Sequence, residues 1–301
     1  MSMSSRAGMN RSVNAGPTIA AALPFTGNTP LISLKKASDL TGCEIYGKAE
    51  WFNPGGSVKD RPELNMIQKG ERNGTLGSGK ILLDATSGNT GIAYAMIGAV
   101  KGIPVKLAMP ENVTPERLKI LKAYGAELVL TSGRKGSDGA ILMAKELYAE
   151  KPDCYFYPDQ YGNPANWQAH YQTTASEIYE QTNGLITHFV TGLGTTGTFI
   201  GTSRKLKELN SVIQCFSMQP DSPLHGLEGM KHMPSSIVPG IYDSRVADGE
   251  LNVSTEAAQE MVLRLAQEEG LLVGISAGAN VVAAMKLAEN CLLYTSPSPR
   301  D

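Results

Sequence analysis

The chain has 301 residues, which is long enough for two domains with a sizeable core. Its 27 basic and 29 acidic side chains nearly balance, and the formal net charge of −2 excludes a general attraction to nucleic acid or anionic membranes. The cysteines, Cys43, Cys154, Cys215 and Cys291, are widely spaced, which excludes a metal knuckle and favours reduced thiols in the cytoplasm.

Residues 1–26 are predicted to be a disordered leader, rich in serine, alanine and asparagine. This stretch contains Arg6 and Arg11 but no acidic residue, so an organelle-targeting segment is an alternative interpretation. The apolar run Ile19–Leu23 is too short for a signal peptide or a membrane helix.

A lysine loop at residues 53–61 (Asn-Pro-Gly-Gly-Ser-Val-Lys-Asp-Arg) is the most informative stretch of the sequence. Asn53-Pro54 followed by two glycines is typical of a turn, and Ser57 is expected to cap a helix whose first turn holds Lys59. The positive end of a helix disfavours a cation and helps a lysine to lose the proton that prevents imine formation. The simpler interpretation is a solvated Lys59 paired with Asp60.

Strand-like and helix-like segments alternate along the rest of the chain. This pattern predicts an α/β fold with parallel strands and right-handed crossovers, and a break at 151–153 separates a second α/β unit. Strands are expected at 31–34, 44–48, 80–84, 105–109, 128–131, 186–190 and 212–218, and helices at 89–100, 115–124, 140–150, 167–181, 197–209, 257–269 and 277–289. Residues 220–240 are expected to be irregular.

Two of the predicted strands run into glycine- and threonine-rich turns that open helices. These are residues 86–91 (Thr-Ser-Gly-Asn-Thr-Gly) and 191–198 (Thr-Gly-Leu-Gly-Thr-Thr-Gly-Thr). Backbone N–H groups at a helix start favour an anion, while the Walker lysine and the Rossmann glycine spacing are both missing. With the lysine loop, the pattern indicates a phosphorylated carbonyl cofactor bound through an imine, and pyridoxal 5′-phosphate meets that description.

The sequence resembles the fold-type II pyridoxal-phosphate enzymes and, among them, the cysteine synthases. The resemblance runs from Thr26 to Asn290 and is carried by motifs at 27–31, 53–61, 86–91, 159–166, 194–198 and 274–278. Thr195-Thr196-Gly197-Thr198 is more similar to the B-type branch than to the A-type enzymes, which usually have two glycines between the threonines.

The resemblance implies a role for each matching residue. Lys59 would hold the cofactor as an imine and later act as the base, and Asn89 would bind the ring oxygen of the cofactor. The phosphate would lie on Gly194, Thr195, Thr196, Gly197 and Thr198, and the substrate α-carboxylate on Thr86, Ser87 and Thr90 with the help of Gln160. To act near neutral pH, Lys59 needs a pKa about three units below its usual 10.4.

The activity implied is β-replacement on O-acetylserine or O-phosphoserine with sulfide or another sulfur donor. Lys231 lies near the place where some relatives have a phosphate-binding arginine, although a loop lysine is more often simply solvated. The alternatives are a related enzyme of the cystathionine β-synthase or serine/threonine dehydratase type, and an inactive fragment that only binds a partner. The resemblance also suggests a homodimer and serine acetyltransferase as a partner.

The resemblance implies two three-layer α/β/α domains with mostly parallel sheets. The larger, phosphate-binding domain is expected at 27–48 and 152–290, and the smaller, mobile, substrate-binding domain at 49–151. Residues 291–301 match neither the family's later strand nor its terminal segment. Leu292 to Tyr294 begin like a strand before a Ser-Pro repeat, so this end is predicted to be a foreign or disordered tail.

Overall fold

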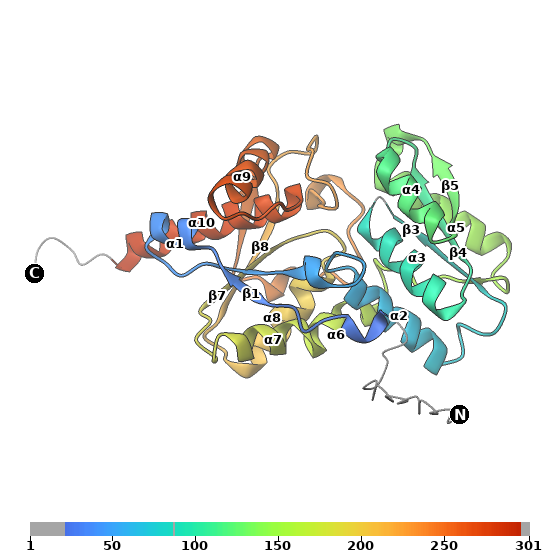
Figure 1. Cartoon of the computed structure of the whole chain (residues 1–301), viewed down its shortest axis with the longest axis horizontal. Coiled ribbons are helices and arrows are strands. Elements are labelled where there is room, and N and C mark those ends of the chain that lie inside the picture. Colours follow the sequence, from blue (N-terminus) through green and yellow to red (C-terminus); the bar gives the residue numbers. More distant parts are fainter. Residues whose placement is uncertain (1–21, 87, 296–301) are drawn as a thin grey trace, which may run out of the picture.

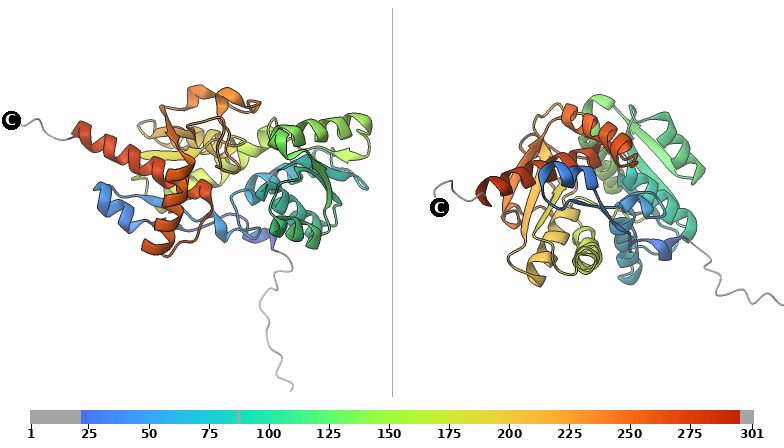
Figure 2. Two further views of the ribbon diagram at one scale, coloured as in Figure 1. Left: turned by 90° about the horizontal axis from the view of Figure 1, so that it is seen from above. Right: turned by 60° about the vertical axis from the view of Figure 1, so that its left-hand side comes forward.

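The computed structural model describes residues 22–86 and 88–295, with side chains as far as residue 289 (Figure 1). Two parallel sheets and one antiparallel strand pair make up its β-structure. The sheets lie side by side with their own helices, as the views in Figure 2 also show. Among the described helices, none is both long and apolar enough to cross a membrane.

The first sheet is entirely parallel, as the alternation of strands and helices predicts. Its strand order is β5-β4-β3-β6. The strands are β3 (Ile81–Ala85), β4 (Val105–Pro110), β5 (Glu127–Thr131) and β6 (Tyr155–Phe156), and the helices packed with them are α3 (Asn89–Lys101), α4 (Pro115–Ala123) and α5 (Gly136–Glu150). Apolar side chains of β3, β4 and α3 form the core with Met66 and Ile67 of α2 (Asp60–Arg72).

The second sheet is also parallel and has the order β7-β8-β9. Its strands are β7 (His188–Gly192), β8 (Gln214–Pro220) and β9 (Gly249–Val253). The helices of this part are α6 (Pro164–Gln172), α7 (Thr174–Gln181), α8 (Gly197–Leu209), α9 (Thr255–Glu268) and α10 (Ile275–Thr295). One core lies toward α9 and α10, and another lies toward α8.

An antiparallel pair near the start of the described chain leads into the lysine loop. Strands β1 (Leu31–Ser33) and β2 (Tyr46–Lys48) flank the short helix α1 (Lys35–Thr41). Five 3-10 turns complete the secondary structure of the described residues: η1 (Leu23–Phe25), η2 (Glu50–Phe52), η3 (Gly133–Lys135), η4 (Met233–Ser235) and η5 (Ser244–Val246).

The structure corrects several of the expected elements. Helix α2 begins at Asp60 with Lys59 as its N-cap residue, so Ser57 is not the cap and Lys59 precedes the first turn. The helix expected at 167–181 is interrupted at Thr173, whose hydroxyl donates to the carbonyl of Ala169 (2.7 Å) and whose backbone departs from helical angles. Residues 292–294 lie in α10 and not in a strand.

Sequence patterns also missed α1, β6 and β9. All are short, and β9 alternates half-buried glycine and leucine with exposed glutamate and asparagine. Residues 22–26, which were predicted as the end of a disordered leader, instead contain the turn η1, while residues 1–21, Ser87 and the tail after residue 295 lie outside the described residues. The division into a larger and a smaller, mobile domain stays a prediction.

Candidate active site

Lys59 lies at the amino end of α2, where the lysine loop turns into the helix. Its backbone N–H donates to Ser57 Oγ (3.2 Å), and the residue is half-buried. Burial lowers the pKa of Lys59, against the opposing effect of the negative charges of Glu63 and Glu50. A lysine in this place is therefore better able than an exposed one to present a neutral amine.

The Asp60 carboxylate accepts a hydrogen bond from the backbone N–H of Gly55 (2.5 Å) and so closes the lysine loop on itself. Burial raises the pKa of Asp60 to about 6. Asp60 is 0% exposed, and none of the ion pairs between described residues joins it to Lys59, so the simpler interpretation of the loop as a solvated Lys-Asp pair is wrong.

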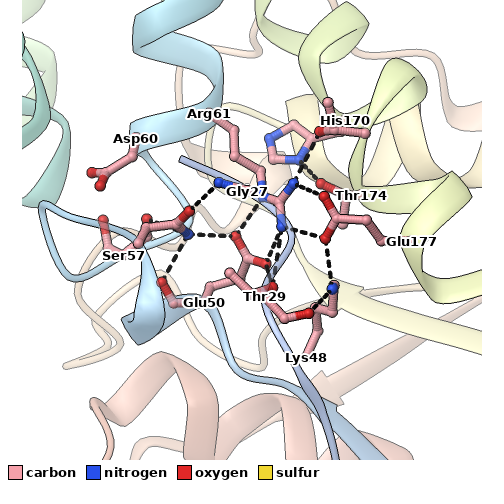
Figure 3. A network of polar contacts seen from close by, with 12 residues as sticks. Gly27, Thr29, Lys48, Glu50, Ser57, Asp60, Arg61, His170, Thr174 and Glu177 are labelled. Carbon is pink, nitrogen blue, oxygen red and sulfur yellow. Dashed lines mark hydrogen bonds and ion pairs between the residues drawn. The ribbon is translucent and has the colours of Figure 1, made fainter. Parts of the chain in front are cut away.

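Arg61 anchors the first turn of α2 through a buried network of ion pairs (Figure 3). Its Nε and Nη2 donate to the two carboxylate oxygens of Glu50 (2.7 and 2.8 Å). Its Nη1 and Nη2 donate to the two oxygens of Glu177 (2.6 and 2.8 Å), and further bonds reach the hydroxyls of Thr29 and Thr173. Such paired, two-pronged contacts fix the helix start in both position and direction.

Asn53 connects this network to the lysine loop. Its Nδ2 donates to Glu50 Oε2 (2.9 Å) and to the carbonyl of Ser57 (3.1 Å), while its Oδ1 accepts from the N–H of Gly27 (2.8 Å). The turn that carries Lys59 is thus connected through Asn53 to Gly27 on one side and to Glu50 on the other.

The loop after β3 brings together three of the residues predicted to bind the substrate carboxylate. Thr86 Oγ1 accepts from the N–H groups of Gly88 (3.0 Å) and Gly91 (3.1 Å), so its hydroxyl shapes the loop. Thr90 Oγ1 donates to Gln160 Oε1 (3.0 Å), and Gln160 Nε2 donates to the carbonyl of Ala85.

Two further residues of this loop, Asn89 and Ser87, were predicted to bind the cofactor ring oxygen and the substrate carboxylate. Asn89 is the first residue of α3 and is exposed. Ser87 lies outside the described residues.

Asp84, near the end of β3, is a buried carboxylate beside this loop that sequence patterns did not reveal. It accepts from the hydroxyl of Tyr94 (2.9 Å), from the N–H of Ala85 (2.8 Å) and from the N–H of Gln160 (3.4 Å). Burial raises its pKa to about 7. Asp84 therefore helps to hold the backbone of Gln160 in place. The sequence signal that could have revealed Asp84 is an acidic residue near the end of an otherwise apolar strand.

The segment Gly194–Thr198, here called the threonine loop, follows β7 and includes the first two residues of α8. Thr196 adopts a left-handed backbone (φ 72°), which is costly for a threonine, and its buried hydroxyl has no hydrogen-bond partner in the described chain. A Cβ on Gly194 would lie 2.3 Å from the carbonyl oxygen of Gly229, and one on Gly197 would lie 1.8 Å from Asn166 Oδ1. Close backbone packing, an unpaired hydroxyl and a helix start together suit an anion such as phosphate.

Helix α6 joins the lysine helix to the threonine loop. Asn65 of α2 donates to the carbonyl of Ala165 at the start of α6 (2.7 Å). Asn166 donates to Thr195 Oγ1 (3.1 Å) and to the carbonyl of Gln160 (2.7 Å). One helix therefore sets the positions of the lysine, the threonine loop and Gln160 relative to one another.

His170 lies buried on the same helix, between the hydroxyls of Thr174 (3.0 Å) and Thr198 (3.3 Å). Burial holds its pKa well below the ordinary value, and the positive charges of Arg61 and Lys59 lower it further. The imidazole is therefore neutral at neutral pH and supports the threonine loop as a hydrogen-bonding group.

Lys231 is buried, contrary to the simpler expectation of a solvated loop lysine. Its Nζ forms an ion pair with Asp138 Oδ1 (3.1 Å) and lies 5.3 Å from the ring centre of Tyr161. This position, beside the residue that follows Gln160, brings Lys231 to the border of the site.

These residues fit a cofactor with a carbonyl and a phosphate group. The unpartnered hydroxyl of Thr196 and the tight packing of Gly194 and Gly197 suit the phosphate, and the half-buried Lys59 suits the carbonyl. Within the described residues, no group of three His, Cys, Asp or Glu side chains is arranged to hold a metal ion.

Comparison with known proteins agrees with this geometry. The model of the family described as "Pyridoxal-phosphate dependent enzyme" matches residues 22–292. A cysteine synthase of Aquifex aeolicus is 52% identical over 88% of this chain and 82% of its own length. Cysteine synthase B of Pseudomonas aeruginosa is 43% identical over 92% of each chain. A crystal structure of cysteine synthase from Entamoeba histolytica superimposes with a TM-score of 0.85 at 35% identity, covering 96% of this chain and 86% of that one.

Proposed function

Because this chain belongs to the pyridoxal-phosphate dependent enzymes and, within them, to the cysteine synthases, we propose that it makes L-cysteine by β-replacement on an O-activated serine. Pyridoxal 5′-phosphate is the cofactor of this family, and fold type II is the architecture of the chain. The substrates are an amino acid and a sulfur donor.

The observation that carries the proposal is the joint support of the lysine and the threonine loop by α6. Asn65 and Asn166 connect α6 to the lysine helix on one side and to Thr195 on the other. A cofactor spanning the two loops would be held at both its carbonyl and its phosphate, which is the arrangement that imine chemistry requires.

Each group of residues then has a defined task. The threonine loop would bind the phosphate, Asn89 the ring oxygen, and Thr86, Ser87, Thr90 and Gln160 the substrate α-carboxylate. Once bound, the cofactor supplies an acceptor for the electron pair left when the α-proton is removed. Lys59 Nζ would take that proton, and its burial favours the neutral amine that this step needs.

For the amino-acid donor we propose O-acetylserine first and O-phosphoserine second, with sulfide as the sulfur donor. Lys231 could contribute a positive charge to a phosphate ester, but its Nζ is already paired with Asp138. O-phosphoserine would therefore have to compete with a carboxylate for this lysine, whereas O-acetylserine has no such requirement.

We further propose that the enzyme works in the cytoplasm as a homodimer and that it can bind the tail of a serine acetyltransferase. The alternatives of a cystathionine β-synthase or dehydratase type would use the same lysine and the same carboxylate pocket. A protein that binds the partner without turnover is the remaining alternative, and turnover measurements on the same sample distinguish it.

The decisive experiment is a visible absorption spectrum of the purified protein before and after addition of each donor. We expect a cofactor band that Lys59→Ala abolishes, that O-acetylserine shifts, and that sulfide restores with release of cysteine. A protein that stays colourless after incubation with pyridoxal 5′-phosphate would overturn the proposal. Release of pyruvate in place of cysteine would support the dehydratase alternative.

A further inference from the structure

We propose that Asn166 is a positioning residue for the cofactor phosphate, and that it couples the threonine loop to Gln160 in the substrate pocket. The inference rests on the proposed function, which gives these two places their tasks. Asn166 would act through Thr195 and Gln160, because its side chain is hydrogen-bonded to both.

Asn166 is the third residue of α6, and it is 1% exposed. The start of α6 is fixed by its N-cap residue Asn163, which accepts from the N–H of Ala165 (2.9 Å) and donates to the carbonyl of Pro158 (2.8 Å). On the side of α8, a Cβ on Gly197 would lie 1.8 Å from Asn166 Oδ1. The amide group is therefore held between two closely packed helices and has little room to rotate.

The two N–H groups of this amide have different acceptors. Asn166 Nδ2 donates to the carbonyl of Gln160 (2.7 Å) and to Thr195 Oγ1 (3.1 Å), which uses both hydrogens of the nitrogen. The reverse orientation of the amide would place two acceptor oxygens, Asn166 Oδ1 and the Gln160 carbonyl, against each other. The Gln160 carbonyl thus determines that a donor faces Thr195.

This contact decides how the hydroxyl of the half-buried Thr195 can be used. A hydroxyl group has one hydrogen to donate and two lone pairs that accept. The lone pairs of Thr195 receive an N–H of Asn166 and, at a longer distance, the backbone N–H of Gly197 (3.5 Å). None of the hydrogen bonds between described residues has this hydroxyl as donor. Its hydrogen is therefore left for an added acceptor, and a phosphate oxygen meets that requirement.

The second bond of Asn166 extends the effect to the substrate pocket. Asn166 holds the backbone carbonyl of Gln160, whose side chain is bonded to Thr90 and to the carbonyl of Ala85. Both bonds of Asn166 start from one nitrogen atom, so a shift of Thr195 on phosphate binding alters the contact with Gln160. The places predicted for the phosphate and for the substrate carboxylate are thus connected through a single side chain.

The first test isolates the phosphate by comparing pyridoxal 5′-phosphate with pyridoxal, which lacks that group. Both are titrated into the cofactor-free protein, and the ratio of their dissociation constants is measured. We expect Asn166→Ala to reduce the preference for the phosphorylated form at least fivefold, because Thr195 loses the bond that orients it. A general loosening of the fold would weaken both ligands and leave the ratio unaltered. Asn210→Ala, at the far end of α8, is the control and should also leave the ratio unaltered.

The same ratio in a Thr195→Val background shows whether Asn166 acts through the hydroxyl. Valine keeps the shape of threonine without its hydroxyl, so Asn166→Ala should there change the ratio less than twofold. An unchanged ratio for Asn166→Ala alone, or an equal fall in both backgrounds, would overturn the inference.

A second test needs neither the bound cofactor nor turnover. Inorganic phosphate is added to the cofactor-free protein, and amide hydrogen exchange is followed in peptides that cover residues 159–163 and 194–198. We expect phosphate to slow exchange in both peptides of the wild type, but only in 194–198 of Asn166→Ala. No difference at 159–163 between the two proteins would overturn the inference. Phosphate protection in a protein that never binds the cofactor at Lys59 would contradict the proposed function alone.

Discussion

At the scale of single residues, the tightest packing of the site lies at the threonine loop. Gly197 has the Oδ1 atom of Asn166 directly against it, and Asn166 is in turn fixed by its bonds to Gln160 and Thr195. The loop therefore has little freedom to move away from a new side-chain atom. The loop can adopt this shape only because residue 197 is a glycine, without a Cβ atom that would clash with Asn166.

We expect Gly197→Ala to weaken pyridoxal 5′-phosphate binding at least tenfold, because the new Cβ would lie 1.8 Å from Asn166 Oδ1. Titration of the cofactor-free protein, followed by visible absorbance, measures the effect. Gly77→Ala is the control, since a Cβ there meets only one backbone oxygen, at 3.9 Å. Equal affinities for the two variants would show that the threonine loop does not hold the cofactor.

Short motifs made two turns of the candidate site recognisable in the sequence. Glycine and threonine patterns at predicted helix starts indicate the turns at 86–91 and 191–198, and the roles of Thr86, Thr90 and the threonine loop stay predictions that rest on the resemblance. Asp84 was missed because an isolated acid in a strand is usually solvated. Its burial depends on contacts with residues distant in the sequence, and local patterns do not contain that information.

At the scale of elements, helix α2 is fixed by charge at its first turn and by apolar packing further along. Arg61 joins α2 to the carboxylates of η2 and α7, while Met66 and Ile67 enter the core of the first sheet. Losing one partner of such a buried pair leaves the other charge uncompensated. The position of Lys59 therefore depends on α7, which touches α2 through this network.

The Glu177 carboxylate should make the protein sensitive to acid. Although burial alone would raise its pKa, hydrogen bonds from Arg61 and Lys48 lower the pKa from 4.5 to about 2. Because the pKa in the folded state lies below that of the unfolded chain, the stabilisation is complete above about pH 4.5 and is lost as the pH falls toward 2. The loss over this range is at most about 3 kcal/mol.

We therefore expect Glu177→Gln to be less stable than the wild type at pH 7, with a difference that shrinks between pH 4.5 and pH 3. Urea unfolding at these pH values measures it. Glu268→Gln, which breaks an ion pair on the surface of α9, should change the unfolding free energy by less than about 0.5 kcal/mol. A difference for Glu177→Gln that stays constant with pH would contradict this account.

Most of the longer elements were predictable, because alternating apolar strands and amphipathic helices have distinct periods. The parallel direction of β3, β4 and β5 and of β7 and β8 followed from the helices between them. The break at Thr173 was not predictable, since it involves a hydroxyl that also accepts a bond from Arg61, 112 residues earlier. Strand β9 has a weak strand pattern of its own, and it is recognised as a strand by its hydrogen bonds to β8.

At the scale of the whole molecule, two ion pairs connect the segment after β8 with the helices of the first sheet. Lys231 pairs with Asp138 of α5 (3.1 Å), and Glu228 pairs with Arg117 of α4 (3.1 Å). Both contacts lie between parts that are remote in the sequence. The segment is therefore well placed to influence how the two sheets approach each other around the site.

We expect Asp138→Asn to raise KM for the amino-acid substrate about three- to tenfold with a smaller change in kcat, since the buried Lys231 loses its carboxylate and the contact between the parts weakens. Steady-state kinetics with O-acetylserine measures both parameters. Glu268→Gln serves as the control for loss of an ion pair elsewhere. Unchanged KM for Asp138→Asn would exclude this contact from substrate binding.

The network around Arg61 also bears on how the protein is made. Arg61 leaves the ribosome 116 residues before its partner Glu177, and Asn65 emerges 100 residues before Ala165. Until α6 and α7 have been synthesised, the start of α2 lacks the contacts that fix it. The growing chain can therefore carry a complete lysine loop before the residues that fix it have been made, and the lysine and the threonine loop can come together only after residue 198 has been synthesised.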